Sequence, residues 1–162
     1  MKKGAKIHIL IVCTGNTCRS PMAKAILEKL LKEKKLKIKV AVNSAGIISL
    51  GGSPASRTAV EVCRENGVDL SGHQSKRLTE NLIQDADLII VMEQMHQELL
   101  LKSSAVAQQK IRLLSEFAAD RSVGSEIRDP YGGDKYHYEQ AYRDIELCLQ
   151  GLVSSLEGSI TV

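Results

Sequence analysis

Four short segments with the composition of β-strands recur along the chain, separated by longer segments with helical periodicity. They lie at residues 7–12, 36–46, 86–92 and 110–114. The segment 7–12 is a short, nearly all-apolar run, which is typical of a parallel strand because helices cover both faces of a parallel sheet, whereas 36–46 alternates and then turns. Strands that alternate with helices are joined by right-handed crossovers. The pattern predicts an α/β fold, a three-layer sandwich in which helices flank a four-stranded parallel sheet.

The segments between these strands carry start and stop signals for helices. Ser20-Pro21 is expected to open the first, because proline fits the first helical position. Gly67 is expected to end the second, and Thr79 and Asp134 to begin two later ones. The predicted helices span residues 20–31, 53–67, 78–85, 94–103 and 134–156. No repeat or linker interrupts them, so we expect one domain over residues 1–162.

Cysteine usage and hydropathy bear on the cellular compartment. No stretch is long and apolar enough for a membrane span, and no small-residue cleavage site precedes Cys13. We therefore expect a cytoplasmic protein with no membrane association, in which thiols stay reduced. Cys63 and Cys148 fall on apolar helical stripes and are expected in the core. The cysteines show no zinc-ligand spacing with histidine, so no metal is expected.

The charge is uneven along the chain. Residues 1–39 hold ten lysines and Arg19 against two acidic residues, although the net charge of the whole chain is only +3. Such a run is ordinarily a solvated helix face, and it can also attract phosphorylated or acidic partners. Aromatic residues do not interleave with the bases, which argues against binding of nucleic acid.

The loop between the first strand and the first helix, VCTGNTCRSP at residues 12–21, carries the chemistry. Backbone N–H groups and the helix N-terminus form a cradle for anions at such a junction, and Gly15 and Asn16 allow the backbone to curl. Arg19 provides a planar fork that grips two phosphate oxygens. The same positive potential favours the thiolate of Cys13, and Ser20 is placed to donate a hydrogen bond to it.

Transfer of a phosphoryl group to Cys13 expels a leaving group that needs a proton. Asp129 in the later Asp-Pro-Tyr segment is the candidate general acid, because Pro130 holds it extended and the loop is expected at the same sheet edge. Asp134 is a nearby alternative, but it fits a helix N-cap better.

These motifs together resemble the low-molecular-weight protein tyrosine phosphatase family. The resemblance spans nearly the whole chain and rests on five motifs in the family's order. They are VCTGNTCRSPMA near the N-terminus, NSAG at 43–46, SGH at 71–73, ADLIIVM at 86–92 and DPYGG at 129–133. The resemblance implies a four-stranded parallel sheet, no metal or cofactor, and a two-step reaction. Cys13 forms a phosphocysteine while Asp129 protonates the leaving group, and water activated by Asp129 then hydrolyses it.

The resemblance also implies roles for individual residues. Asn16, Ser20, Ser44 and His73 are expected to form the hydrogen-bond network that supports the loop. Cys18 is expected to trap oxidised Cys13 as a reversible disulfide. The residues expected to bind the phosphate or the substrate are Thr14, Gly15, Asn16, Thr17, Cys18, Arg19, Ser20 and Tyr131.

Three departures from the tyrosine-directed pattern bear on the substrate. Thr17 stands where those members carry Ile or Leu, and CTGNTCRS resembles the bacterial protein arginine phosphatase branch. A hydroxyl beside the scissile P–N bond can hydrogen-bond a guanidinium or orient water, whereas a bulky aliphatic residue packs better on a phenyl ring. Tyr131 is the only aromatic residue expected at the mouth of the substrate pocket. Lys24 replaces an acidic residue that is common after SPMA. We expect phosphoarginine in proteins as substrate, with phosphotyrosine as the alternative.

Two other functions on this fold fit less well. An arsenate reductase needs further relay cysteines, and residues 64–147 contain none. A non-hydrolytic phosphocysteine carrier or phosphate-binding module has no need of Arg19 together with Asp129. The expected partners are phosphorylated proteins, and the chain is expected to be a monomer. The four tyrosines between Tyr131 and Tyr142 leave open a phosphorylation site there, although a tyrosine-rich helix start is the simpler explanation.

Overall fold

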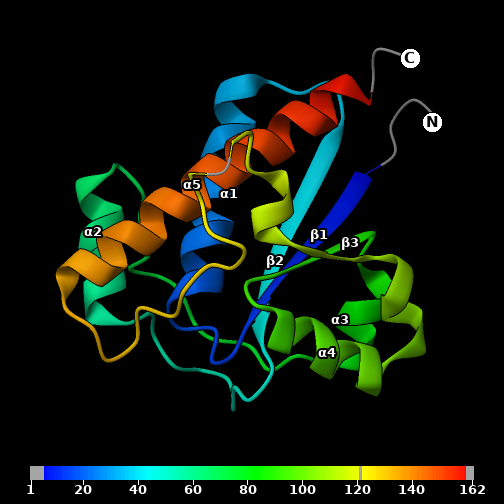
Figure 1. Cartoon of the computed structure of the whole chain (residues 1–162), viewed down its shortest axis with the longest axis horizontal. Helices are drawn as coiled ribbons and strands as arrows, with labels where there is room; N and C mark the ends of the chain where they lie inside the picture. The colour runs from blue at the N-terminus through cyan, green and yellow to red at the C-terminus, as the bar shows by residue number, and fades with distance from the viewer. Residues whose placement is uncertain (1–5, 121, 160–162) are drawn as a thin grey trace.

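A single parallel sheet with helices on both faces organises the protein (Figure 1). The computed structural model describes residues 6–120 and 122–159. The strands are β1 (Lys6–Cys13), β2 (Lys39–Gly46), β3 (Leu88–Val91) and β4 (Ile111–Leu113), in the order β2-β1-β3-β4. The helices are α1 (Arg19–Lys34), α2 (Arg57–Glu65), α3 (Glu80–Asp85), α4 (Gln94–Ser103) and α5 (Lys135–Gly158). The predicted fold class is confirmed.

Two hydrophobic clusters sit on opposite faces of the sheet. Along β1, Ile9 and Ile11 enter the core shared with α1, α2 and α5, whereas Leu10 and Val12 enter the core shared with α3 and α4. This alternation follows from the two-residue period of a strand. In Figure 1, α1 and α5 lie side by side, with α2 beyond them, and α3 and α4 lie on the other side of β1 and β3. Burial on both faces explains why the central strands, β1 from Ile9 onward and β3, are nearly all apolar, whereas the edge strand β2 contains polar residues.

The central position of β1 places the following loop at the binding edge of the sheet. β1 pairs in parallel with β2 on one side and with β3 on the other, and the register ends with Cys13 opposite Gly46. The chain passes from β1 through α1 to β2, and β3 is added on the opposite side of β1. A parallel sheet binds ligands where its strand order reverses in this way, beyond the carboxyl ends of the strands.

Several element boundaries differ from the prediction. Helix α1 begins at Arg19, so Pro21 is its third residue rather than its first; the first-turn N–H groups have no helical partner, so a proline there costs no hydrogen bond. Helix α2 begins only at Arg57, because the Ser56 side chain caps it by accepting from the N–H of Ala59. Short 3-10 helices at Ala105–Gln109 and Leu114–Phe117 were not predicted.

The remaining predicted elements agree with the structure within a few residues. Thr79 and Asp134 cap α3 and α5 as expected. Over the described part of the chain, no helix has the length and apolar character needed to cross a bilayer.

Candidate active site

The loop that joins β1 to α1 curls at one backbone position. Asn16 adopts a left-handed conformation with φ of 56°, which asparagine tolerates better than most residues. Gly15, which we expected to supply the same freedom, does not have a positive φ, and a Cβ added there would meet only the Thr17 Oγ1 at 3.6 Å. The tight turn of the loop therefore depends on Asn16 rather than on Gly15.

The end of β2 and the two residues that follow it hold this loop in place. Ile47 donates its N–H to the Cys13 carbonyl at 3.1 Å, and Ile48 donates to the Thr14 carbonyl at 3.0 Å. At Gly46, an added Cβ would lie 2.7 Å from the Gly15 carbonyl carbon and 2.9 Å from the Thr14 carbonyl oxygen. The glycine of the NSAG motif thus permits a close backbone approach that fixes the loop against the sheet.

The Cys13 sulfur faces donors from its own loop. The N–H of Asn16 donates to Cys13 Sγ at 3.3 Å, and Ser20 Oγ lies 3.0 Å from the same sulfur. The amino end of α1 adds partial positive charge. Cys13 is only 3% exposed, so these groups replace water as its hydrogen-bond partners. The arrangement suits a thiolate nucleophile.

The donor role of Ser20 follows from the orientation of the Asn16 amide. Lys76 donates its backbone N–H to Asn16 Oδ1 at 2.8 Å, which assigns the other amide atom as nitrogen. That Nδ2 donates to Ser20 Oγ at 2.7 Å. The Ser20 oxygen therefore already accepts a hydrogen bond, and its own proton is directed to Cys13.

His73 supports the loop and Ser44 does not. His73 Nε2 donates to the Asn16 carbonyl oxygen at 2.8 Å, and burial of the ring lowers the His73 pKa. Ser44 is buried on β2 opposite Ile11, but within the described residues its side chain makes no hydrogen bond to the loop. The Asn16 amide is instead held by Lys76 and Ser20.

Arg19 is held beneath the loop by three oxygen atoms. Its guanidinium donates to the Ile127 carbonyl at 2.9 Å, pairs with Glu93 Oε1 at 2.9 Å, and pairs with Asp129 Oδ2 at 3.2 Å. Only 1% of Arg19 is exposed. A buried cation needs such compensation. These contacts hold the guanidinium in one orientation, and they bring Asp129 to the cavity that Arg19 and Cys13 also line.

Asp129 approaches the loop from the far end of the chain. Its Oδ1 accepts from the N–H of Tyr131 at 3.1 Å, while its side chain remains 44% exposed. Asp134, the alternative acid, instead accepts from the N–H of His137 as the N-cap of α5. The geometry thus brings Asp129, and not the helix cap, into the cavity with Cys13.

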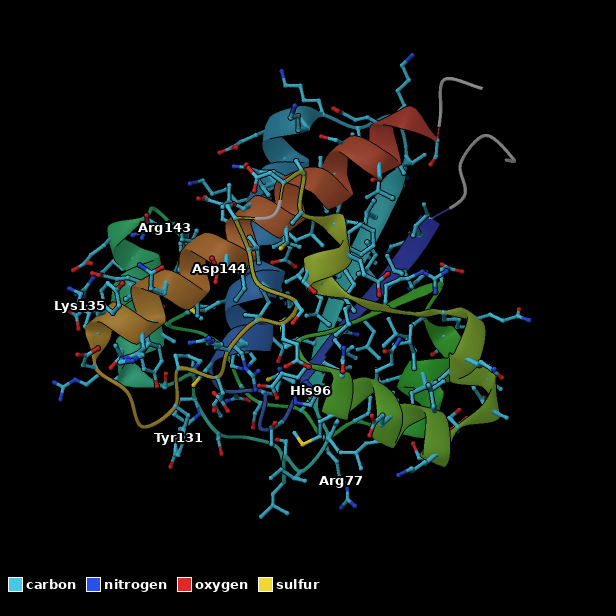
Figure 2. All side chains as sticks on the ribbon, in the orientation of Figure 1. Arg77, His96, Tyr131, Lys135, Arg143 and Asp144 are labelled. Carbon is cyan, nitrogen blue, oxygen red and sulfur yellow. The ribbon has the colours of Figure 1, made fainter. Side chains whose placement is uncertain are left out.

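A cavity of about 220 Å³ opens above Cys13. Tyr131 is 79% exposed and Ile48 is 71% exposed, so these two residues form its rim. Figure 2 shows Tyr131 projecting from the segment before α5, away from the body of the protein. The residues that line the cavity are Cys13, Thr14, Gly15, Thr17, Cys18, Arg19, Ile48, Asp129 and Tyr131.

Two polar side chains of the site, the half-buried Glu93 and the buried His96, were missed from the sequence. Glu93 follows β3 and reaches Arg19, and His96, at the third position of α4, lies with its Nε2 2.8 Å from Thr14 Oγ1. Figure 2 shows His96 in the interior, between α4 and the end of β1. Both residues follow a predicted strand, so the rule that strand ends meet at one edge could have found them.

The remaining cysteines differ in their surroundings. Cys18 Sγ lies 3.3 Å from Ser56 Oγ and 3.7 Å from the Tyr138 hydroxyl, at the base of the cavity. Burial raises the pKa of Cys63 and of Cys148 to about 12, which makes both inert as nucleophiles. The pairing of Cys13 with Cys18 on oxidation stays a prediction. Among the described side chains, no group of three or more His, Cys, Asp or Glu could hold a metal ion.

Comparison with known proteins agrees with this geometry. Residues 8–161 match the low molecular weight phosphotyrosine protein phosphatase family. The chain belongs to this family and is a protein phosphatase.

Its relatives divide between two substrate classes. A protein-arginine-phosphatase of Bacillus subtilis is 33% identical and covers 93% of this chain and 97% of its own length. The probable low molecular weight protein-tyrosine-phosphatase EpsP of Ralstonia nicotianae is 39% identical and covers 85% and 88%. The structure of the YwlE arginine phosphatase from Geobacillus stearothermophilus is 35% identical, has a TM-score of 0.84 and covers 94% of both chains.

Proposed function

We propose that this protein hydrolyses phosphoarginine in proteins through a phosphocysteine on Cys13. Overall similarity does not distinguish the substrates, because arginine- and tyrosine-directed relatives are similarly identical to this chain. The substrate must be distinguished inside the cavity. The observation that carries the proposal is Thr17, which lines the same cavity as Cys13 and Asp129.

The first step transfers the phosphoryl group to the enzyme. The Cys13 thiolate attacks phosphorus, so that an S–P bond forms as the P–N bond breaks. Asp129, protonated, gives its proton to the departing guanidine nitrogen. The backbone N–H groups of the loop and the Arg19 guanidinium hold the equatorial oxygens. The incoming phosphoryl group competes with Asp129 for Arg19, which releases the carboxyl to act on the leaving group.

The second step releases phosphate. Asp129, now a carboxylate, takes a proton from a water molecule that attacks the phosphocysteine. The P–S bond breaks, inorganic phosphate forms, and Cys13 leaves as the thiolate. Ser20, whose proton is directed at the sulfur, favours this leaving group.

Thr17 supports an arginine substrate because its hydroxyl is nearly uncommitted. Within the described residues its one side-chain hydrogen bond is a contact of 3.9 Å to Cys18 Sγ, which is weak. The Thr17 backbone is fixed, since its carbonyl accepts from the N–H of Ser56 at 2.8 Å. A fixed hydroxyl beside the scissile bond can accept a hydrogen bond from the guanidinium of the substrate. A phenyl ring has no group to satisfy it.

Phosphotyrosine remains the second candidate because of the rim. Ile48 and Tyr131 present exposed apolar surface on two sides of the cavity mouth. Such a rim can pack against an aromatic ring as well as against the alkyl chain of arginine.

The experiment compares kcat/KM on matched phosphoarginine and phosphotyrosine peptides for the wild type, Thr17→Ile and Thr17→Ser. We expect the wild type to prefer phosphoarginine. Thr17→Ile should lower the phosphoarginine-to-phosphotyrosine ratio by about tenfold or more, the value of one hydrogen bond to a charged group. Thr17→Ser, the control, keeps the hydroxyl and should keep the ratio. An unchanged ratio in Thr17→Ile would contradict the proposal.

The mechanism has its own test. Cys13→Ser should abolish turnover of both peptides. On an aryl phosphate whose leaving group departs without a proton, Asp129→Ala should slow chiefly the second step, so that phosphoenzyme accumulates and can be trapped by acid quench. Turnover retained in Cys13→Ser would remove the phosphocysteine from the reaction.

A further inference from the structure

The hydrogen bonds of His96 fix where its ring proton lies. The backbone N–H of Glu93 donates to His96 Nδ1 at 3.2 Å. A backbone N–H is only a donor, so Nδ1 carries no proton and the neutral ring carries its proton on Nε2. That Nε2 lies 2.8 Å from Thr14 Oγ1. The ring therefore donates to the threonine oxygen, and its tautomer is set by the backbone N–H of Glu93, the N-cap of α4.

The surroundings of His96 keep it in this neutral form. Burial lowers its pKa to about 4, and the positive charge of Arg19 on α1 acts in the same direction. The carboxylates of Asp129 and Glu126, in the segment before α5, oppose this shift, and Glu93 Oε2 lies 3.8 Å from the ring. At neutral pH the ring thus has a single N–H, on Nε2, and this N–H donates a hydrogen bond to Thr14 Oγ1.

The hydrogen bond from His96 determines how the Thr14 hydroxyl can act. Its oxygen already accepts from His96, so its own proton must be donated elsewhere. Within the described residues it has no other hydrogen-bond partner, and Thr14 lines the cavity between Cys13 and Gly15. The Thr14 hydroxyl is therefore a donor whose proton is not used by any other described group of the protein, and the residue lines the cavity.

We propose that His96 is a positioning residue that fixes the Thr14 hydroxyl as a hydrogen-bond donor to a phosphoryl oxygen above Cys13. The proposal deepens the phosphocysteine mechanism and rests on it. It assigns Thr14 a side-chain role in addition to the backbone role expected from the loop. Since the phosphoryl group is common to all substrates, this hydrogen bond serves phosphoarginine, phosphotyrosine and free phosphate alike.

The test uses two matched pairs of variants and inorganic phosphate as a competitive inhibitor. Thr14→Val removes the hydroxyl and keeps the shape, whereas Thr14→Ser keeps the hydroxyl. His96→Asn can accept from the Glu93 N–H but is too short to reach Thr14, whereas the amide of His96→Gln can reach it. The inhibition constant of phosphate and kcat/KM on an aryl phosphate are measured for each variant, with a thermal melt to confirm folding.

We expect Thr14→Val and His96→Asn each to weaken phosphate inhibition and to lower kcat/KM by about tenfold or more. Thr14→Ser and His96→Gln should retain most of both. The double variant Thr14→Val/His96→Asn should lose no more than Thr14→Val alone, because both act through one hydrogen bond.

Folded Thr14→Val with unchanged phosphate inhibition would overturn the proposal, and so would additive losses in the double variant. These outcomes are distinguishable from failure of the arginine assignment. The phosphoarginine-to-phosphotyrosine ratio depends on Thr17 and should stay constant across the Thr14 and His96 variants. Loss of a phosphocysteine in the acid-quench experiment would instead remove the mechanism on which both rest.

Discussion

Gly46 offers a sharp test of how the sheet holds the phosphate loop. An alanine there would place its Cβ 2.7 Å from the Gly15 carbonyl carbon, 2.8 Å from the Asn16 nitrogen and 2.9 Å from the Thr14 oxygen. All three neighbours are backbone atoms, so no side chain can turn aside. To restore the 3.4 Å of ordinary contact, the loop must retreat by about 0.7 Å from β2.

The expected effect of Gly46→Ala follows from this displacement. Insertion of a methyl group into close-packed backbone costs about 1–3 kcal/mol of unfolding free energy. Misplacement of catalytic groups by about 1 Å costs on the order of a hundredfold in rate. We therefore expect kcat/KM on an aryl phosphate to fall by about ten- to a hundredfold, with a lower midpoint of thermal unfolding.

Gly72→Ala is the matched control, because an added Cβ there meets no atom within 4 Å and the residue has no positive φ. Both variants are compared with the wild type by thermal melt and steady-state kinetics at one pH. If Gly46→Ala is folded and keeps its activity within about twofold of Gly72→Ala, the loop does not depend on this close approach, and the reasoning is wrong.

Three further predictions concern stability. His96 has a pKa of about 4 in the folded protein against 6.5 for an ordinary histidine, so between these two pH values only the unfolded chain binds a proton there. The wild type should therefore lose about 2 kcal/mol of unfolding free energy between pH 7 and pH 5 through this residue. Urea titrations should show a smaller loss in His96→Gln, and an equal loss would contradict the assignment. Gly151→Ala would drive a Cβ into the Phe117 carbonyl oxygen on the 3-10 helix after β4, so we expect destabilisation by about 3 kcal/mol or more, and a melting temperature equal to the wild type's would disprove the contact. Thr79→Ala removes the side-chain cap that accepts from the Leu82 N–H, and urea unfolding should show a loss of about 1 kcal/mol, whereas Thr79→Ser should retain the cap.

The sequence by itself determined the architecture and the chemical centre. Strand and helix periodicities are local, so they predicted four parallel strands and the helices between them. Cys13 and Arg19 lie in one loop at a strand end, and the direction of a parallel strand fixes which edge of the sheet they reach. Asp129, the proposed general acid, was predicted from its local Asp-Pro motif, and the structure places it in the same cavity as Cys13.

The tertiary structure decided what supports these residues. Arg19 is held by Glu93 and by the Ile127 carbonyl, and Thr14 is held by His96, through contacts that cross about 70 to 110 positions of the chain. The distance between such residues is set by how the strands pair and the helices pack, which no local pattern encodes. For the same reason the motif could not show that the Ser44 side chain makes no hydrogen bond to the described loop, or that the backbone N–H of Lys76 donates to Asn16 Oδ1.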